Sequence, residues 1–461
     1  MNEEMRERAK EFADKISTSK KKEITLISHI DADGITSMSI MVRVLKRAKI
    51  RFKGIFLRQL DERTVEKIPG DSSLKLFLDL GSGQQDILEV RGFKREEVLI
   101  IDHHIPGENI YEQFNPLLFQ REEKKVSAAG LAYLVAKNIG ENSDLSKLAI
   151  VGAVGDMMAN ETNRLEGSMR EIVNDARRKG FLKVTKDISA YGISTRPIHL
   201  MLSYTDDPYM DGLTDNKDNC LDLLKDLGIA AKEDERWRVW EDLSREEKRR
   251  IYSELIEKVK EEDQYRLSGE NYIFKDERRR TPLRNAKEYS TLLNACGRWV
   301  KPKIGMDVCL GDRDERYGQA SVLLKNHKRV IRELLEYILK NGVIKRENIQ
   351  YMDAKDNFPD TIIGIGAGMA RSKLDKEIPG KPMIIFGDMV GEEDLRKVSG
   401  RANYEQVKRG INLQEAISRA SQAVGGGGGG HKIAAGGCIP RGTEEAFLNG
   451  LDEIVGEQTA K

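Results

Sequence analysis

The stretch ITLISHIDADG, residues 24–34, joins a run of apolar residues to a polar segment that ends in glycine. Two further apolar runs, LKLFLDL (74–80) and EVLII (97–101), have a similar length and an equally abrupt polar end. Continuous apolar runs of this length, separated by stretches with helical spacing, are typical of parallel strands that are buried on both faces. The sequence therefore predicts an α/β fold whose first domain contains a parallel sheet.

Acidic and histidine side chains follow each of these predicted strands. Alternate residues of an extended segment point the same way, so His29, Asp31 and Asp33 can face one site. In open α/β sheets, ligands bind at the carboxyl ends of the strands. A fourth segment, LAIVGAVGD (148–156), fits either a strand or a helix and also ends in an acid. We therefore expect one cluster that is made of His29, Asp31, Asp33, Asp79, Asp102, His103, His104 and Asp156.

Such a cluster of carboxylates requires positive charge, because the acids would otherwise repel one another. Asp and His ligands without a thiolate suit Mn²⁺ or Mg²⁺ better than a structural zinc. If one carboxylate bridges two ions, the site becomes a two-metal centre that binds phosphate and activates a water. A single Asp after a strand is more often a turn or capping residue. Chance clustering is nevertheless improbable, because four of the six histidines lie within motifs, at positions 29, 103, 104 and 431.

The rest of the chain predicts three domains. Residues 232–262 are highly charged, with an apolar residue every three or four positions, which predicts an amphipathic helical pair with Trp237 and Trp240 on one face. Strand and helix patterns return in PMIIFGDMV (382–390) and GINLQEAISRASQAV (410–424). We therefore predict an N-terminal α/β domain at 1–195, a helical insertion at 196–270 and a smaller C-terminal α/β domain at 271–461.

Three shorter segments have simpler interpretations. Residues 1–20 predict an exposed amphipathic helix, because charged and apolar residues alternate at helical spacing. SAAGLAYLVAKNIG (127–140) predicts a helix that ends at Gly140. GIGAGMAR (364–371) has closely spaced glycines but lacks the rest of a dinucleotide-binding motif, so it predicts a tight turn from strand to helix.

The C-terminal domain contains two candidate phosphate contacts. The first is the glycine run 425–430 and the HKIAAGG that follows it, because glycine backbone can approach a phosphate closely. Six glycines are equally typical of a flexible linker. The second is KVSGRA (397–402), whose alternative is an exposed basic turn. The candidate substrate-binding residues are Lys397, Ser399, Arg401, Gly429, Gly430, His431, Gly436 and Gly437.

Composition limits the class of protein. The 461 residues are 33% charged with a net charge of +1, so positive charge for a nucleic acid must be local or come from metal ions. The four cysteines are widely spaced and predict free thiols in a reducing compartment. No run reaches the roughly 18 apolar residues of a membrane span, and the N-terminus lacks an apolar signal core. We expect a cytoplasmic protein that does not contact a membrane.

These motifs resemble those of the DHH phosphoesterase superfamily, in its RecJ-like form. SHIDADGITS, DLGSG, IDHH and GAVGDMM are similar to its four motifs, and GGGGGGHKIAAGG is similar to the end of its DHH-associated domain. LRNAKEYSTLLNACGR (283–298) and the insertion resemble archaeal members, whereas bacterial RecJ has an acid where His29 stands. The resemblance implies that one metal is held by His29, Asp31 and Asp79, and a second by Asp33, Asp79, His103 and Asp156. It also implies two catalytic residues: His104 would contact the phosphate, and Asp102 would orient the histidines.

The resemblance also implies an activity. It is that of an exonuclease that uses two Mn²⁺ or Mg²⁺ ions to remove nucleotides from single-stranded DNA, 5′→3′, and also from RNA, in DNA replication or repair. The active site would lie in a cleft between the two α/β domains. Archaeal members of this GINS-associated nuclease type bind the GINS replication complex, and residues 232–262 are the candidate docking surface.

Two alternatives stay open. One is a phosphodiesterase for short oligonucleotides, cyclic dinucleotides or phosphoadenosine phosphate. The other is a replication scaffold that binds GINS without catalysis. A scaffold does not need metal ligands, and this chain has all of them, which favours catalysis.

Overall fold

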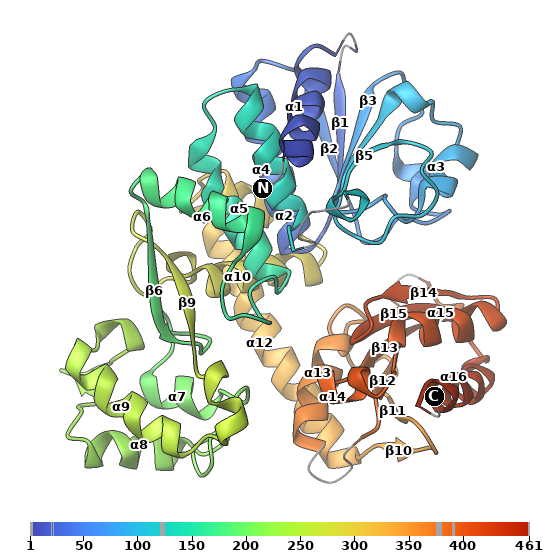
Figure 1. Cartoon of the computed structure of the whole chain (residues 1–461). Helices are drawn as coiled ribbons and strands as arrows, with labels where there is room; N and C mark the ends of the chain where they lie inside the picture. The colour runs from blue at the N-terminus through green and yellow to red at the C-terminus, as the bar shows by residue number, and fades with distance from the viewer. Residues whose placement is uncertain are drawn as a thin grey trace. The chain divides into compact units, whose positions relative to one another are not determined.

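The computed structural model describes residues 3–19, 21, 23–119, 125–374, 380–389 and 392–459. The chain forms two compact units, Met1–Leu324 and Lys325–Lys461 (Figure 1). Helix α12 (Glu315–Asn341) contains the boundary between them. Each unit has its own sheet and its own hydrophobic core, as expected for a chain of this length.

A five-stranded parallel sheet forms the centre of the first unit, in the order β2-β1-β3-β4-β5. The three predicted strands are confirmed as β1, β3 and β4. The two outer strands were not predicted, because β2 is only half-buried and β5 has only 3 residues, so neither gives a continuous apolar run. The strands are β1 (Ile24–His29), β2 (Phe52–Leu57), β3 (Leu74–Leu78), β4 (Val98–Ile101) and β5 (Glu112–Phe114).

Helices cover both faces of this sheet, as Figure 1 shows for α1, α2 and α4 on one side and α3 on the other. Successive strand residues point to opposite faces, so Leu26 and Leu76 join one core while Ile27 and Phe77 join the other. The helices are α1 (Glu3–Ser17), α2 (Ala32–Arg47), α3 (Gln85–Val90), α4 (Ala128–Ile139), α5 (Ser146–Gly155) and α6 (Gly167–Arg178).

Three predictions about these helices have clear outcomes. The helix that ends at Gly140 is confirmed as α4. The ambiguous segment 148–156 is helical, since α5 ends at Gly155 and Asp156 is its C-cap. The N-terminal helix α1 exists, but the prediction that it is exposed is wrong, because its apolar face, with Phe12 and Ile16, is buried in the main core.

The helical insertion has a separate core that includes Met201, Cys220 and Trp240. The predicted helical pair at 232–262 is wrong. Residues 232–262, all of them described, begin with a short hairpin that has Asp234 at φ +52° in its turn. Their one α-helix starts at Arg245, after a capping box formed by Ser244. The elements are β6 (Leu182–Ile188), α7 (Ile198–Ser203), α8 (Lys217–Asp226), β7 (Lys232–Glu233), β8 (Arg236–Trp237), α9 (Arg245–Glu257) and β9 (Ser268–Phe274).

The two tryptophans of the insertion therefore do not share a helix face. Trp237 lies on β8 and is 38% exposed, whereas Trp240 lies in a 3₁₀ turn and is 1% exposed. Trp240 donates a hydrogen bond from Nε1 to Asp187 over 2.9 Å, which ties the turn to β6.

Residues 271–324, which we placed in the C-terminal domain, belong to the first unit. The reason is packing, because α10 (Ala286–Arg298) and α11 (Pro302–Cys309) bury Leu292, Leu293 and Val308 in the main core of this unit. Strand β9 also pairs with β6, so the chain returns directly after the insertion to the strand from which the insertion begins.

The second unit has a six-stranded sheet in the order β10-β11-β12-β13-β15-β14. The predicted strand at 382–390 is confirmed as β12, except that Val390 lies outside the described residues, and the predicted helix at 410–424 is confirmed as α15. The elements are β10 (Ile344–Lys345), β11 (Gln350–Asp353), α13 (Ile363–Leu374), β12 (Met383–Asp388), β13 (Leu395–Arg401), α14 (Tyr404–Lys408), α15 (Leu413–Ala423), β14 (Gly427–Gly430), β15 (Ala434–Pro440) and α16 (Glu444–Thr459).

Two glycine-rich segments differ from expectation. GIGAGMAR is not a turn but lies inside α13, where its glycines permit close packing, since a Cβ at Gly366 would lie 2.3 Å from Leu334 of α12. The glycine run forms the edge strand β14, which pairs with β15 in an antiparallel register. It is therefore not a flexible linker.

Candidate metal centre

The segment HIDADG forms a tight corner between β1 and α2. His29 is the last residue of β1, Asp31 is the N-cap of α2, and Asp33 lies in its first turn. The Asp31 carboxylate accepts a hydrogen bond from the Gly34 backbone N–H over 3.0 Å. A Cβ at Gly34 would lie 2.2 Å from the His29 carbonyl oxygen, so only glycine permits this corner.

Asp79 follows β3 and adopts a left-handed backbone conformation, with φ +61°. Both of its carboxylate oxygens are buried and lack a hydrogen-bond partner among the described residues. The His29 Nδ1 atom lies 3.2 Å from Asp31 Oδ2 and 3.4 Å from Asp79 Oδ2. Ligand atoms of these three residues all lie within 4.8 Å of one another, which is a spacing that one cation can bridge.

His103 faces the other side of Asp79. Its buried Nε2 atom lies 3.4 Å from Asp79 Oδ1, 3.5 Å from Asp156 Oδ2 and 3.9 Å from Asp33 Oδ2. Like the Asp79 oxygens, this nitrogen has no hydrogen-bond partner among the described residues. The structure thus brings all six predicted metal ligands together, with Asp79 between two groups of donor atoms.

Helix α4 holds Asp33 in place. The two oxygens of this carboxylate accept hydrogen bonds from the backbone N–H groups of Ala128 and Ala129, over 2.7 and 3.1 Å. Helix α5 approaches closely, since a Cβ at Gly152 would lie 2.5 Å from Asp33 Oδ1. Asp33 is therefore fixed before any ion binds, which lowers the entropic cost of forming the site.

The electrostatics of the cluster show an excess of negative charge. Burial raises the pKa of Asp33 well above its usual value, and the charges of Asp79 and Asp156 raise it further. Burial likewise raises the pKa of Asp156, to about 6, although His103 opposes this shift. Burial alone would lower the pKa of His103, but the surrounding carboxylates outweigh it and raise that pKa. Carboxylates and imidazoles in this arrangement fit hard divalent cations such as Mn²⁺ or Mg²⁺.

Asp102 orients one of the two histidines that follow it. Its buried carboxylate accepts hydrogen bonds from His104 Nδ1 over 2.7 Å and from the Ser82 N–H over 3.0 Å. It contacts His103 only through the backbone N–H, over 2.8 Å, so the expectation that it orients both rings holds for His104 alone. Burial would raise the pKa of Asp102, but the neighbouring His104 outweighs it and lowers that pKa. The His104 side chain stays 41% exposed and can meet a substrate.

Helix α10 supplies two contacts that sequence reasoning did not identify. The Asn294 side-chain oxygen accepts a hydrogen bond from the Ala32 N–H over 2.9 Å. One turn further on, a Cβ at Gly297 would lie only 2.0 Å from the Ile30 carbonyl oxygen. Both residues lie in the segment 283–298, so its resemblance to archaeal family members was the one available signal. Helix α10 therefore supports the corner that carries the metal ligands.

The predicted substrate contacts of the second unit divide between two faces of its sheet. Lys397, Ser399 and Arg401 alternate along β13 and so share one face, and in the register Ser399 lies opposite Gly436 and then Gly429. His431 lies in the turn between β14 and β15. Two of the predicted glycines, Gly430 and Gly437, point to the other face.

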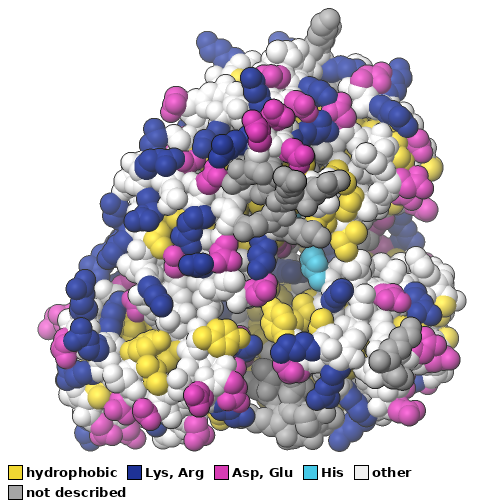
Figure 2. Space-filling view, viewed as in Figure 1, with side chains coloured by type: hydrophobic (Ala, Val, Ile, Leu, Met, Phe, Trp, Pro, Cys, Tyr) yellow, Lys and Arg dark blue, Asp and Glu magenta, His cyan; other side chains and the backbone are white. Residues whose placement is uncertain are grey.

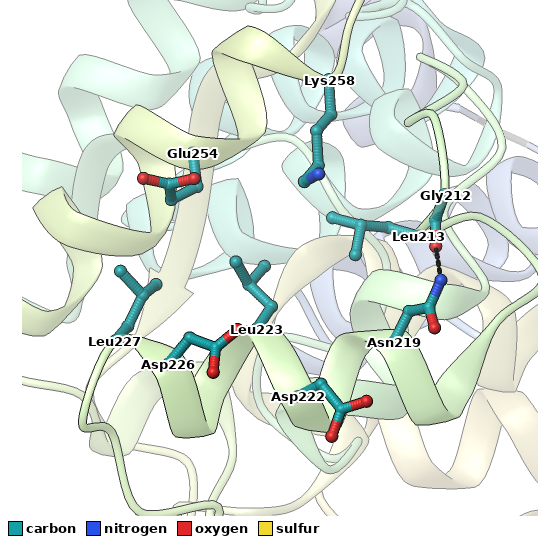
Figure 3. A pocket seen from close by; sticks show the side chains of 9 residues that line it. All are labelled: Gly212, Leu213, Asn219, Asp222, Leu223, Asp226, Leu227, Glu254 and Lys258. Carbon is teal, nitrogen blue, oxygen red and sulfur yellow. Dashed lines mark hydrogen bonds between the residues drawn. The ribbon is translucent and has the colours of Figure 1, made fainter.

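On the face shown in Figure 2, basic side chains do not gather in a single region. Figure 2 shows Lys and Arg side chains spread over the visible face, with Asp and Glu between them. A separate pocket lies between α8 and α9 of the insertion and contains none of the predicted site residues (Figure 3). Asp222, Asp226 and Glu254 line it together with Leu223 and Lys258, and this excess of acids disfavours phosphate.

Comparisons with known proteins agree with the geometry of the site. Family models match residues 23–155 (DHH family, N-terminal domain), 190–266 (DHH-CID domain) and 347–457 (DHHA1 domain). The chain therefore belongs to the DHH family of phosphoesterases, with a RecJ-like fold. It is 32% identical to an uncharacterized protein from Methanocaldococcus jannaschii, over 94% of both chains.

Solved structures share the fold at low sequence identity. An exonuclease RecJ bound to manganese is 18% identical, with a TM-score of 0.56 over 98% of this chain and 94% of that one. RecJ from Thermus thermophilus with Mn²⁺ is also 18% identical, with a TM-score of 0.58, and 55% of that chain is covered. CDC45 from Entamoeba histolytica is 14% identical, with a TM-score of 0.63 over 98% and 97% of the two chains. Among the described helices, none is long and apolar enough to cross a membrane.

Proposed function

We propose that this protein is an exonuclease that depends on Mn²⁺ or Mg²⁺ and hydrolyses terminal phosphodiester bonds of single-stranded DNA, and also of RNA. One observation carries the proposal: buried ligand atoms of Asp79 and His103 have no hydrogen-bond partner within the described part of the chain, and they face further carboxylates. Burying such atoms costs several kcal/mol unless a cation or proton satisfies them. The metal-bound RecJ structures have the same fold, which supports the assignment of the metal.

The donor set divides naturally between two ions. His29, Asp31 and Asp79 would hold one ion, and the oxygens of Asp33, Asp79 and Asp156 together with His103 would hold the second. When bound, a pair of divalent ions supplies an activated water and neutralises the charge that develops on the phosphate. The residues of the chain position the ions, since α4 fixes Asp33 and α10 fixes the backbone next to Asp31.

His104 is the candidate residue for the scissile phosphate. The hydrogen bond from its Nδ1 to Asp102 fixes the orientation of the ring, and the rest of the imidazole remains accessible. A ring held in this way can donate to a phosphate oxygen or assist the leaving group, and no further entropy is lost in orienting it. The Asp102 carboxylate is itself held by the Ser82 N–H, so the pair is rigid.

The second unit is proposed to hold the strand behind the terminal nucleotide. Lys397, Ser399 and Arg401 share one face of its sheet and can donate to successive phosphates. Gly429 and Gly436 lie on the same face and leave room for a backbone to approach. Gly437 is better explained by packing, because a Cβ there would lie 2.9 Å from Ser421 Oγ of α15. The cleft between the two α/β domains stays a prediction, as does the 5′→3′ direction.

The test is digestion of DNA and RNA 20-mers, labelled at either end, with Mn²⁺ or Mg²⁺. The wild-type protein should release labelled mononucleotides from one end, and Asp33→Ala should release none. Asp86→Ala is a matched control, because Asp86 lies in the first turn of α3 and not in the cluster. If Asp33→Ala retains full activity, the proposed metal site is wrong. If a dinucleotide is hydrolysed much faster than the 20-mer, the alternative of a small oligonucleotide, cyclic dinucleotide or phosphoadenosine phosphate substrate is favoured instead.

The similarity to CDC45 keeps the scaffold role as a second candidate. Under it, the insertion would contact a replication complex such as GINS, and catalysis would be secondary. Co-purification of GINS with the full chain, and with a chain that carries charge reversals on the exposed face of α9, tests this candidate. Loss of GINS only in the second chain would support docking through α9.

A further inference from the structure

A basic and aromatic site lies where the helical insertion begins, in the first unit. Arg196 precedes α7, and its guanidinium carbon lies 4.6 Å from the ring centre of Tyr191 and 5.1 Å from that of Tyr204. Within the described ranges, the guanidinium of Arg196 contacts these two rings and forms no ion pair with a carboxylate. A cation stacked between two rings without a counter-ion can still accept an anion.

The position of Arg196 is built into the backbone of its loop. Gly192 has φ +95°, and a Cβ there would lie 2.6 Å from Arg196 Cδ, so the arginine side chain fills the space that glycine leaves. The Arg196 N–H also donates to the Gly192 carbonyl oxygen over 2.8 Å. The buried Glu288 of α10 accepts a hydrogen bond from the Ser194 N–H over 2.8 Å and another from the Thr195 hydroxyl. The loop is therefore held in one conformation.

The same helix connects this loop to the metal centre. Glu288 holds the loop, and Asn294, six residues later on α10, holds the Ala32 N–H of the metal-binding corner. Six helical residues span about 9 Å. Between them, Ser290 Cβ lies 3.0 Å from where a Cβ of Gly155 would be, next to the metal ligand Asp156. One helix thus holds both the loop that carries Arg196 and the corner that carries the metal ligands.

Tyr204 completes the site from the other end of α7. It is the C-cap of this helix, and it is 58% exposed although it packs against the guanidinium of Arg196. An exposed ring beside an unpaired cation is the combination that binds a single strand, because bases stack on the ring and the cation meets the phosphate. A ring and cation that served packing alone would have no reason to stay accessible.

We propose that Arg196 and Tyr204 form a binding subsite for single-stranded nucleic acid, in which Arg196 contacts a phosphodiester and Tyr204 stacks on a base a few nucleotides from the cleaved bond. This inference deepens the proposed function and rests on it for the choice of ligand. It predicts that the two residues act on strand binding and not on the chemical step.

Binding of a fluorescein-labelled 20-mer of deoxythymidine, measured by anisotropy without added metal, tests the subsite directly. We expect Arg196→Ala and Tyr204→Ala each to weaken binding about 5- to 30-fold. Tyr204→Phe should bind as the wild type does, because the ring is kept. Arg249→Ala is the matched control, since Arg249 is 74% exposed on α9 of the same insertion, and it should change binding less than twofold.

The salt dependence separates a phosphate contact from a structural role. For a single strand, each phosphate contact contributes about 0.7 to the slope of log K against log salt concentration. Arg196→Ala should therefore reduce this slope by about 0.7, whereas Tyr204→Ala should leave it unchanged. Equal slopes for the wild type and Arg196→Ala, with unchanged affinity, overturn the proposal. The proposal is also overturned if the melting temperature of Arg196→Ala falls by more than about 5 °C, because unfolding then explains the loss of binding.

Kinetics then connect the subsite to catalysis. With Mn²⁺, Arg196→Ala should raise KM for the 20-mer about tenfold and change the hydrolysis of a dinucleotide less than twofold, because a dinucleotide is too short to reach the subsite. Equal losses on both substrates overturn the subsite. If the wild-type protein hydrolyses neither substrate, the proposed function fails, and the anisotropy and salt measurements still decide whether the subsite exists.

Discussion

Gly297→Ala is the substitution that most directly probes how the metal-binding corner is held. A Cβ at this position would lie 2.0 Å from the Ile30 carbonyl oxygen, whereas real Cβ contacts essentially never fall below 3.0 Å. Helix α10 must therefore move by about 1 Å away from the corner, because neither partner is a flexible side chain. The same movement stretches the hydrogen bond between Asn294 and the Ala32 N–H.

The magnitude follows from these two contacts. Forced overpacking costs about 1–3 kcal/mol, and weakening one hydrogen bond costs about 1 kcal/mol more. Alanine regains up to about 1 kcal/mol of helix propensity. The free energy of unfolding of the first unit should therefore fall by about 1–3 kcal/mol, which corresponds to a drop of roughly 2–10 °C in its melting temperature.

Gly318→Ala provides the matched control, because Gly318 is a helical glycine of the same unit with open space where its Cβ would be. It should raise the free energy of unfolding by about 0.5–1 kcal/mol. Calorimetry with and without Mn²⁺ measures both variants. Saturating Mn²⁺, at about 100 times its Kd, should stabilise the wild type and Gly318→Ala by about 2.7 kcal/mol. It should stabilise Gly297→Ala less, because the corner carries ligands of both ions. If the two alanine variants are equally stable and respond equally to Mn²⁺, α10 does not support the corner.

Three further predictions concern other parts of the chain. Asp102→Asn should lower the single-turnover rate of mononucleotide release about 100-fold, because an amide has one accepting oxygen and cannot keep both the His104 ring and the Ser82 N–H bonded as the carboxylate does. An unchanged rate would show that the pair of Asp102 and His104 has no role in the reaction. Glu277→Gln should reduce stability to urea at pH 7 more than at pH 4. Burial raises the pKa of Glu277, but Arg313 and Lys147 outweigh burial and lower this pKa below its value in the unfolded chain, so the carboxylate stabilises the fold fully above about pH 4.5 and less as the pH falls. Equal losses of stability at both pH values would contradict this. Gly437→Ala should destabilise the second unit by about 1–3 kcal/mol in thermal unfolding, whereas Gly427→Ala, with open space around its Cβ, should not; equal effects would show that Gly437 is not a packing residue.

The ligands of the metal centre could be predicted because each follows an apolar run or segment of the sequence. The ends of parallel strands meet at one edge, so His29, Asp79 and His103 had to come together once three strands were recognised. Asp156 was included although its segment was ambiguous between strand and helix. The supporting contact of Asn294 could not be derived in this way, because it joins positions 262 residues apart through a helix whose docking is a property of the whole core.

The errors have an equally local cause. In 232–262 the periodic apolar residues suggested a pair of helices, but the backbone turns at Asp234 and α9 begins only after the capping box at Ser244. In 364–371 and 425–430 the conformational freedom of glycine suggested a turn and a flexible linker. The structure places the first segment inside α13, where Gly366 leaves space for Leu334, and the second in the edge strand β14, so the turn and the flexible linker are wrong. The phosphate contact at 429–430 stays a prediction. The periodicity of a sequence does not show which residues pack against a given position. For glycine, this neighbour decides whether the residue lies in a helix, a strand or a turn.

The insertion and the metal centre are joined more closely than their separation in the sequence implies. The chain enters the insertion along β6 and leaves it along β9, and these two strands pair over their full length, from Leu182 with Phe274 to Ile188 with Ser268. Helix α10 is the next α-helix along the chain, and it is held at two points, by the loop that Glu288 contacts and by the corner that Asn294 contacts. A helix is stiff over two turns, so its two contacts cannot shift independently. A ligand that binds the loop of Arg196 would therefore act on the same helix that holds the backbone next to Asp31, which would couple the proposed strand-binding subsite to the metal-binding corner.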